Sequence, residues 1–200
     1  LKCAGGNIFT LNGIELYYGK KNFKNKNFVA FGKNKKFPSS NFFFENCGNL
    51  KKYKNKIDLA VDSLKKGKLI IFPTETVYGI GALGSDKKAI SSIYLAKKRP
   101  QNNPLIAHFF NIEQMLQYVH FNPLALNLAS IFWPGPLTLV LNILKDNEFS
   151  KILSRGRSSL AVRIPSHPVA LDLLKKVNYP LLAPSANKSG GVSPTSPKHV

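Results

Sequence analysis

The stretch from Phe72 to Gly81 places several polar side chains directly after an apolar run. It reads FPTETVYGIG, so two hydroxyls, a carboxylate and a phenol precede two glycines. Glycine lets the backbone approach a ligand closely, and polar loop side chains can bind that ligand. The same letters are also typical of an ordinary turn between a strand and a helix. We interpret the stretch as a candidate ligand-facing loop.

Basic side chains follow at the end of the next predicted helix. Lys97 and Arg99 stand just before Pro100, where a proline restricts the chain. A guanidinium offers a planar fork and an ammonium a compact charge, so both suit anionic oxygens, of phosphates above all. The alternative is a solvated basic helix end that interacts favourably with the helix dipole, and for Lys98 we prefer it.

Arg163 lies within the otherwise apolar run LAVRI. A buried arginine needs a partner, because breaking a buried ion pair costs about 3 to 5 kcal/mol. A ligand carboxylate is one candidate partner, and Glu75 is the other. His108, in the apolar run LIAHFF, is either a core histidine or a site residue.

The segment SANKSGGVSPT, residues 185–195, combines hydroxyls with glycines. Backbone amides of such a loop can cradle an anion, and a flexible linker has the same composition. Several other sites are absent from the sequence. It has no phosphate-loop or dinucleotide fingerprint, no nucleophile elbow, and no His/Cys set at metal-ligand spacing.

Alternating helices and strands must position these groups, which predicts the α/β class. We expect helices over 57–64, 86–97, 111–119, 122–132 and from Ser166 to 174, and strands over 69–72, 104–110, 137–143, 160–164 and 181–183. Asp86 and Asn111 are the predicted caps of their helices, and Asn122 with Pro123 is predicted to open the fourth. Most of these strands carry or precede one of the polar clusters. Ligands of open α/β sheets bind beyond strand ends, so the clusters are predicted to converge on one cleft.

Length and composition favour one domain with an extension. Residues 1–54 are rich in Lys and Asn without a sustained period, which predicts a poorly ordered basic extension, and 55–200 form the predicted domain. The formal charge of +19 suits a nucleic-acid partner, but an AT-rich coding sequence would also produce it. Cys3 and Cys47 form no disulfide framework, and no apolar run is long enough to span a membrane, so we expect a cytoplasmic protein.

Five stretches in order resemble the motifs of the YrdC family, the threonylcarbamoyl-adenylate synthases. They are FPTETVYGIG, AKKRPQNNPLIAH, WPGPLTLVL, LAVRIPSHP and APSANKSGGVSPT, and the resemblance runs from about Asp58 to Pro197. It implies a twisted open mixed sheet with flanking helices around a basic cavity. The family continues beyond the position of Val200, so the resemblance predicts a C-terminally truncated copy with impaired activity. Lys98 stands where the family usually has Gly, a surface change that we expect to be tolerated.

The resemblance also implies an activity. The expected enzyme is an L-threonylcarbamoyladenylate synthase, a nucleotidyltransferase that forms threonylcarbamoyl-AMP and pyrophosphate from L-threonine, bicarbonate and ATP. Its product serves tRNA threonylcarbamoyladenosine modification, so the downstream transfer machinery is an expected partner. Mg²⁺ is expected with the nucleotide, not in a protein metal site.

Site residues follow from the motif positions. The resemblance assigns L-threonine binding to Thr76, His108, Arg163 and Ala183, and ATP binding to Arg99, Asn103, Ser159, Ser185 and Ser193. Lys97 and Arg99 are the expected catalytic pair, which would offset phosphate charge as pyrophosphate leaves. One alternative is a noncatalytic double-stranded RNA or tRNA-binding module of the same fold. Another is a carbamoyl-adenylate-forming domain that serves a different acceptor, as in hydrogenase maturation.

Overall fold

The computed structural model describes residues 7–10, 28–31, 50–144 and 148–200, with side chains from Lys56 onward except 145–149. The chain divides into two compact units, Leu1–Cys47 and Gly48–Val200. In the first unit, β1 (Asn7–Thr10) pairs antiparallel with β2 (Phe28–Phe31). The expectation of poor order over 1–54 otherwise concerns residues that lie mainly outside the described ranges.

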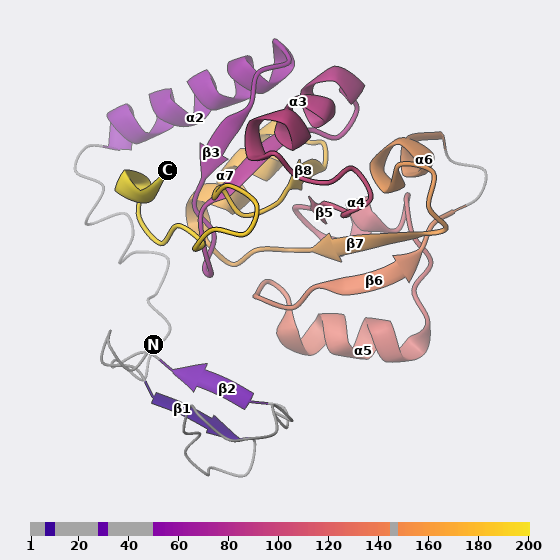
Figure 1. The fold of residues 1–200 in the computed structure, drawn as a ribbon. Coiled ribbons are helices and arrows are strands. Elements are labelled where there is room, and N and C mark those ends of the chain that lie inside the picture. Colours follow the sequence, from indigo (N-terminus) through magenta and orange to yellow (C-terminus); the bar gives the residue numbers. More distant parts are fainter. Residues whose placement is uncertain (1–6, 11–27, 32–49, 145–147) are drawn as a thin grey trace. The chain divides into compact units, whose positions relative to one another are not determined.

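The second unit is built on a six-stranded mixed sheet (Figure 1). Its strands, in spatial order, are β3 (Ile70–Phe72), β4 (Gly79–Leu83), β8 (Leu181–Ala183), β5 (Ile106–His108), β7 (Ser159–Arg163) and β6 (Leu139–Asn142). Neighbouring strands β5 and β7 run parallel, and the other neighbours run antiparallel. This arrangement confirms the predicted open mixed α/β sheet.

Helices flank this sheet. They are α2 (Leu50–Lys65), α3 (Lys87–Lys97), α4 (Ile112–Met115), α5 (Pro123–Phe132), α6 (Glu148–Ser154) and α7 (Pro168–Val177), followed by a short 3₁₀ turn, Pro197–His199. Three of them begin at predicted caps: Asp86, Asn111 and Asn122 each accept hydrogen bonds from the first-turn amides. For α7 the cap is His167, whose Nδ1 accepts from the Val169 amide, one residue after the predicted start at Ser166.

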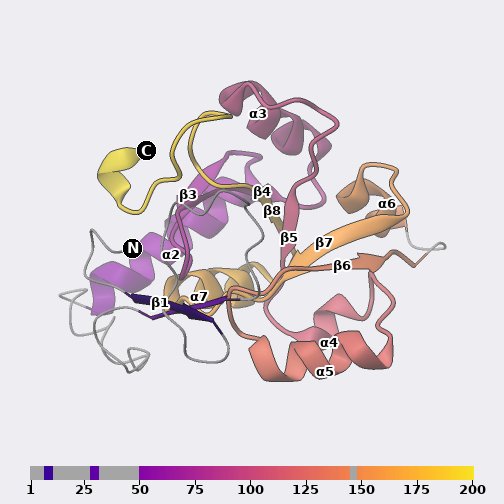
Figure 2. The same ribbon diagram turned by 60° about the horizontal axis from the view of Figure 1, so that its bottom comes forward.

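Two hydrophobic cores hold the unit together. In the first, Ile57, Val61 and Leu64 of α2 pack with side chains of α7 and with Phe72, Leu181 and Ala183. In the second, residues from α3, α4, α5 and α6 pack against Ala82, Ala107, Val162 and Leu182. Successive residues of β8 thus belong to different cores, as expected of a strand covered on both sides. Figure 2 shows α5 beside β6 and α7 near β3, in agreement with Figure 1.

Four local predictions differ from the structure. The helix predicted over 57–64 begins earlier, at Leu50. Gly79 and Gly81 belong to strand β4, not to a bend, and a Cβ on Gly81 would lie 2.8 Å from the Phe72 ring. The helix predicted over 111–119 ends at Met115, because the next residues turn back toward β6, where His120 N donates to Asn142 O. No helix is predicted between 143 and 160, but α6 lies there.

Within the described ranges, no helix is both long enough and apolar enough to span a membrane.

Candidate active site

A cavity of about 270 Å³ opens where the β3–β4 loop, β5, β7 and the end of β8 meet. It is lined by Thr74, Thr76, Val77, Gly79, Arg99, Pro104, Ile106, His108, Arg163, Ala183, Pro184 and Ser185. Six of the ten predicted site residues therefore line one cavity. Lys97, Asn103, Ser159 and Ser193 are not among its lining residues.

The β3–β4 loop is folded by the hydroxyl of Thr74. Its Oγ1 donates to the Val77 carbonyl at 2.6 Å and accepts from the amides of Val77 and Thr76 at 3.2 and 3.3 Å. The Thr76 hydroxyl lies 3.0 Å from this oxygen. Because the Thr74 hydroxyl forms hydrogen bonds with backbone groups of its own loop, it fixes the loop conformation, and with it the neighbouring side chains, in the absence of a ligand.

Arg163 ends β7 and is buried, at 7% exposure. Its Nη2 donates to Glu75 Oε1 at 2.6 Å and to Thr76 Oγ1 at 3.2 Å, and its Nε donates to the Gly135 carbonyl at 3.3 Å. The second oxygen of Glu75 accepts from the Ser166 amide at 3.1 Å. Glu75 is therefore the partner that the sequence required for this buried charge.

His108 ends β5 beside Arg163, its partner in the parallel β5–β7 register. Its Nδ1 lies 3.1 Å from the Ile106 carbonyl, which can only accept, so this nitrogen carries the proton. Burial, helped by the charge of Arg163, lowers the pKa of His108 to about 4. The ring is therefore neutral near pH 7, and it meets Phe72 edge-on.

Arg99 is held from the loop that follows α3. Its Nη2 donates to Asn103 Oδ1 at 2.8 Å and to the Pro104 carbonyl at 2.9 Å, while its Nε donates to the Asn103 carbonyl at 3.3 Å. Asn103 thus contacts Arg99, which lines the cavity, and is not itself a lining residue. The guanidinium is preorganised at the rim, as suits binding of anionic oxygens.

Lys97 is buried, at 3% exposure, and its ammonium points at backbone instead of the cavity. Nζ donates to the Ser185 carbonyl at 2.5 Å and to the Asn187 carbonyl. The Lys97 carbonyl in turn accepts from the Ser189 amide at 3.0 Å. Burial and the nearby Arg99 charge lower the pKa of Lys97. We call the segment that it holds, residues 185–191, the serine loop.

The two remaining predicted residues lie outside the cavity wall. Ser159 starts β7, where it pairs with Asn142 of β6. Ser193 is exposed just beyond the serine loop, next to Pro194, whose carbonyl accepts from the Tyr78 amide at 2.8 Å. Sequence reasoning did not select Thr74 or the buried Asn187 Oδ1, which has no hydrogen-bond partner. The quoted motifs contain both.

This cavity combines two fixed guanidinium groups, one neutral imidazole and several hydroxyls. Such a set can bind a carboxylate and a phosphate side by side, and it provides charge compensation without a covalent nucleophile. Within the part of the chain that the structure describes, no group of three His, Cys, Asp or Glu side chains could hold a metal ion.

Comparison with known proteins assigns the family. The Sua5/YciO/YrdC family model, which carries the description "Telomere recombination", matches residues 62–200. The chain belongs to this family. A threonylcarbamoyl-AMP synthase of Pyrococcus abyssi is 47% identical over 146 residues, which cover 72% of this chain and 42% of the relative. A synthase of Aliivibrio fischeri is 31% identical, over 67% of this chain and 73% of the relative.

Solved structures agree with the fold. P. abyssi Sua5 in complex with L-threonine is 46% identical, with a TM-score of 0.67 over 72% of this chain and 42% of that one. E. coli YciO is 26% identical, with a TM-score of 0.62 over 69% of this chain and 66% of that one. The chain spans about two fifths of the length of the P. abyssi protein.

Proposed function

We propose that this chain is an L-threonylcarbamoyladenylate synthase that forms threonylcarbamoyl-AMP and pyrophosphate from L-threonine, bicarbonate and ATP. One observation carries the proposal: Arg163, His108, Arg99 and Ser185, from three separate motifs, line a single cavity. The names of the P. abyssi and A. fischeri relatives support it, and they favour it over a noncatalytic RNA-binding module. The proposed catalytic domain is 55–200.

The amino acid would bind at the Arg163 end. Arg163 would meet the threonine carboxylate, with the Thr76 hydroxyl and the backbone of Ala183 completing the pocket. The guanidinium is already held by Glu75 and Gly135, so binding would not have to order it. The neutral imidazole of His108 adds no charge repulsion toward a cationic amine.

The nucleotide would bind at the Arg99 end. Arg99, fixed by Asn103, would contact phosphate oxygens, and Ser185, Ser159 and Ser193 would supply further polar contacts. Lys97 would act as a positioning residue that holds the serine loop, because its ammonium is bonded to two carbonyls of that loop. Mg²⁺ would travel with the triphosphate and neutralise part of its charge.

The reaction then needs positioning more than a reactive side chain. The threonine amine and bicarbonate, with loss of water, form a carbamate, and a carbamate oxygen attacks the α-phosphorus of ATP. The bond to the bridging oxygen breaks, and pyrophosphate leaves with the electron pair. Arg99 would stabilise the charge that develops on the phosphates. We propose that the product serves tRNA modification in the cytoplasm through a downstream transfer machinery.

The decisive experiment measures pyrophosphate release with each substrate omitted in turn, and identifies threonylcarbamoyl-AMP by mass spectrometry. Release should require both L-threonine and bicarbonate. Arg99→Gln should lower the rate by about 10²-fold or more, whereas Lys98→Gln, one residue away and exposed, should leave it near wild type. Release that is indifferent to threonine would contradict the proposal.

A further inference from the structure

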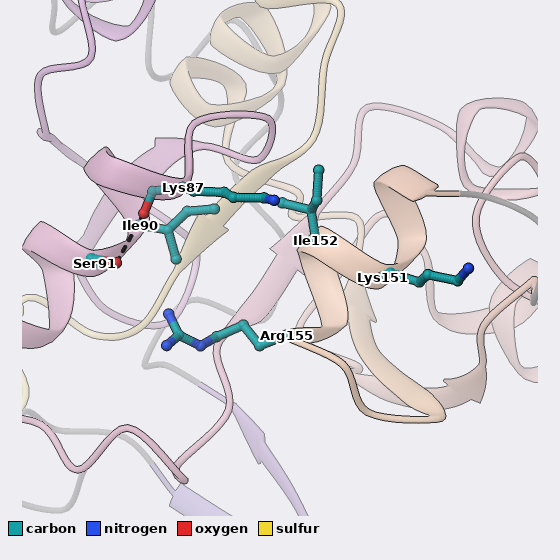
Figure 3. A pocket seen from close by; sticks show the side chains of 6 residues that line it. All are labelled: Lys87, Ile90, Ser91, Lys151, Ile152 and Arg155. Atoms are coloured by element: carbon teal, nitrogen blue, oxygen red, sulfur yellow. Dashed lines mark hydrogen bonds between the residues drawn. The ribbon is translucent and has the colours of Figure 1, made fainter.

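A second hollow, larger than the candidate active site, lies between α3 and α6. Its volume is about 540 Å³, and it is lined by Lys87, Ile90, Ser91, Lys151, Ile152 and Arg155. The lining residues of the two cavities do not overlap. Figure 3 shows Lys87 reaching from α3 toward Ile152 and Arg155 reaching back toward α3, while Lys151 points away from α3.

Cations dominate the lining of this hollow. Lys87, Lys151 and Arg155 contribute three positive charges, and none of the six lining residues is acidic. The ion pairs seen among the described side chains join Arg163 to Glu75 and Lys176 to Asp58, so these three cations take part in neither. The Asp86 carboxylate, next to Lys87 in sequence, accepts from the Lys88 and Ala89 amides through Oδ1. The hollow therefore has an excess of positive charge that suits an anion.

Arg155 is held in place on one side. Its guanidinium lies over the Tyr94 ring, 4.5 Å from the centroid, and its Nη2 donates to Gln101 Oε1 at 3.1 Å. Stacking on an aromatic ring keeps the planar fork oriented, so less side-chain entropy is lost when an anion binds. A planar donor set fits two oxygens of one phosphate.

The other lining residues indicate what kind of chemical group is attached to the bound anion. Ile152 and the small exposed edge of Ile90 supply apolar surface. Ser91 follows Lys87 by one turn of α3, and its hydroxyl donates to the Lys87 carbonyl at 2.9 Å. The volume falls in the range of small-molecule sites and exceeds what one inorganic phosphate occupies. A sugar and base have the apolar faces that this surface can cover.

We propose that the hollow between α3 and α6 is a second binding site, and that it takes the phosphate of a nucleotide unit. Lys87 and Arg155 bind the phosphate from opposite walls, and Ile152 is the main apolar contact of the attached nucleoside. The nucleotide unit comes either from a free mononucleotide or from an RNA strand. This site is independent of the proposed synthase reaction.

The test maps and measures binding on the full chain by amide NMR. Three probes are titrated separately: inorganic phosphate, AMP, and a short RNA hairpin. The amides of Ile90, Ser91 and Ile152 report on the hollow, while those of Thr76 and Ser185 report on the other cavity. Saturable shifts at Ser91 and Ile152 with AMP or RNA are expected.

Matched variants decide whether the lining cations cause this binding. Lys87→Gln combined with Arg155→Gln should weaken binding at the Ser91 amide by about tenfold or more, because two charge-assisted contacts are lost. Lys66→Gln combined with Lys68→Gln removes the same charge from exposed positions outside the hollow and should change affinity by less than about threefold. Arg155→Lys keeps the charge but loses the planar fork, and should give an intermediate loss.

The measured affinities distinguish a free mononucleotide from an RNA strand as the ligand. RNA that binds at the Ser91 amide at least about tenfold tighter than AMP identifies a strand as the source, and equal affinities identify a free nucleotide. Three results would overturn the proposal: no shift at Ser91 or Ile152 with either AMP or RNA, equal losses in both double variants, or inorganic phosphate binding as tightly as AMP.

Discussion

At the scale of single residues, hydrogen bonds to several partners fix the guanidinium of Arg163. Nη2 is shared by Glu75 and Thr76, and Nε is bonded to the Gly135 carbonyl. Because these partners come from different elements, the guanidinium is fixed independently of any ligand. A ligand carboxylate meets a cation whose position is already set, which lowers the entropic cost of binding.

The Arg163→Ala variant should mainly weaken binding of L-threonine. The binding free energy should fall by about 2 to 5 kcal/mol, because the truncation leaves two carboxylates, that of the ligand and that of Glu75, without the guanidinium that pairs with them. Calorimetric titration of L-threonine measures it. Arg163→Lys serves as the control, since it retains charge while losing the fork, and it should lose less. Unchanged threonine affinity in the alanine variant would remove Arg163 from the amino-acid pocket.

His108 makes a separate prediction about acid stability. Burial keeps its pKa near 4 in the folded protein, against 6.5 as the usual value, so the unfolded chain binds a proton first as pH falls. The stabilisation from a neutral His108 is fully present above about pH 6.5 and is lost as pH falls toward 4. The slope reaches at most about 1.4 kcal/mol per pH unit for one proton.

Chemical denaturation at several pH values between 4 and 7 measures this slope. His108→Gln should flatten it, because glutamine does not titrate. Some slope should remain, since burial also lowers the pKa of the half-buried His167. A variant with the full wild-type slope would show that other groups carry the acid sensitivity.

At the scale of elements, one side chain joins the end of α3 to the serine loop. The ammonium of Lys97 is bonded to two carbonyls of that loop, and the Ser189 amide is bonded to the Lys97 carbonyl. The loop also contacts the β3–β4 segment, where the Ala186 amide donates to the Tyr78 carbonyl at 2.8 Å. Three separate segments are thus held together next to Ser185 and Gly79, which line the cavity.

Lys97→Met should release this loop without emptying the core. Two carbonyls lose a charged donor, and each such loss costs about 1 to 3 kcal/mol when the group stays buried. We expect faster hydrogen exchange at the Ser189 amide and weaker ATP binding. Lys98→Met is the matched control, because Lys98 is the exposed neighbour and should leave both values near wild type. Equal effects of the two variants would argue against a specific role for Lys97.

The comparison of sequence and structure is clearest at this scale. Local capping chemistry was readable: Asp86, Asn111 and Asn122 cap helices as predicted. Strand β4 could not be predicted, because its two glycines are typical of turns. The structure shows that they leave room for the Phe72 ring, which lies beside them. That contact is made across the sheet and leaves no local pattern. The α6 helix was missed for a related reason, since its seven residues show too few apolar repeats.

For the site residues too, some features could be predicted from the sequence and others depend on tertiary packing. Motif order predicted that Arg99, His108, Arg163 and Ser185 would converge, and they line one cavity. The direction of each side chain could not be read in this way. Lys97 turns to backbone carbonyls, because this contact depends on how distant segments pack. For Arg163 the sequence offered Glu75 as one of two partners, and the structure shows that pair. The functional roles of these residues remain predictions.

At the scale of the whole molecule, the core of the second unit is completed by α2. Ile57, Val61 and Leu64 of this helix are buried against α7 and the sheet. Each such side chain contributes about 1.5 to 3 kcal/mol on burial. Their sum is comparable to the 5 to 15 kcal/mol that stabilises a typical domain. The folding unit must therefore include the part of α2 that carries Ile57, Val61 and Leu64.

Two fragments test this boundary. A fragment of residues 48–200 retains every side chain of both cores, so it should unfold cooperatively and bind L-threonine as the full chain does. A fragment of residues 66–200 lacks α2 and exposes the partners of Ile57, Val61 and Leu64, such as Leu173 and Leu174. It should show no cooperative thermal transition, because the lost burial is about as large as the whole stability. Thermal unfolding measured by circular dichroism distinguishes the two fragments. A stable 66–200 fragment would show that the core does not need α2.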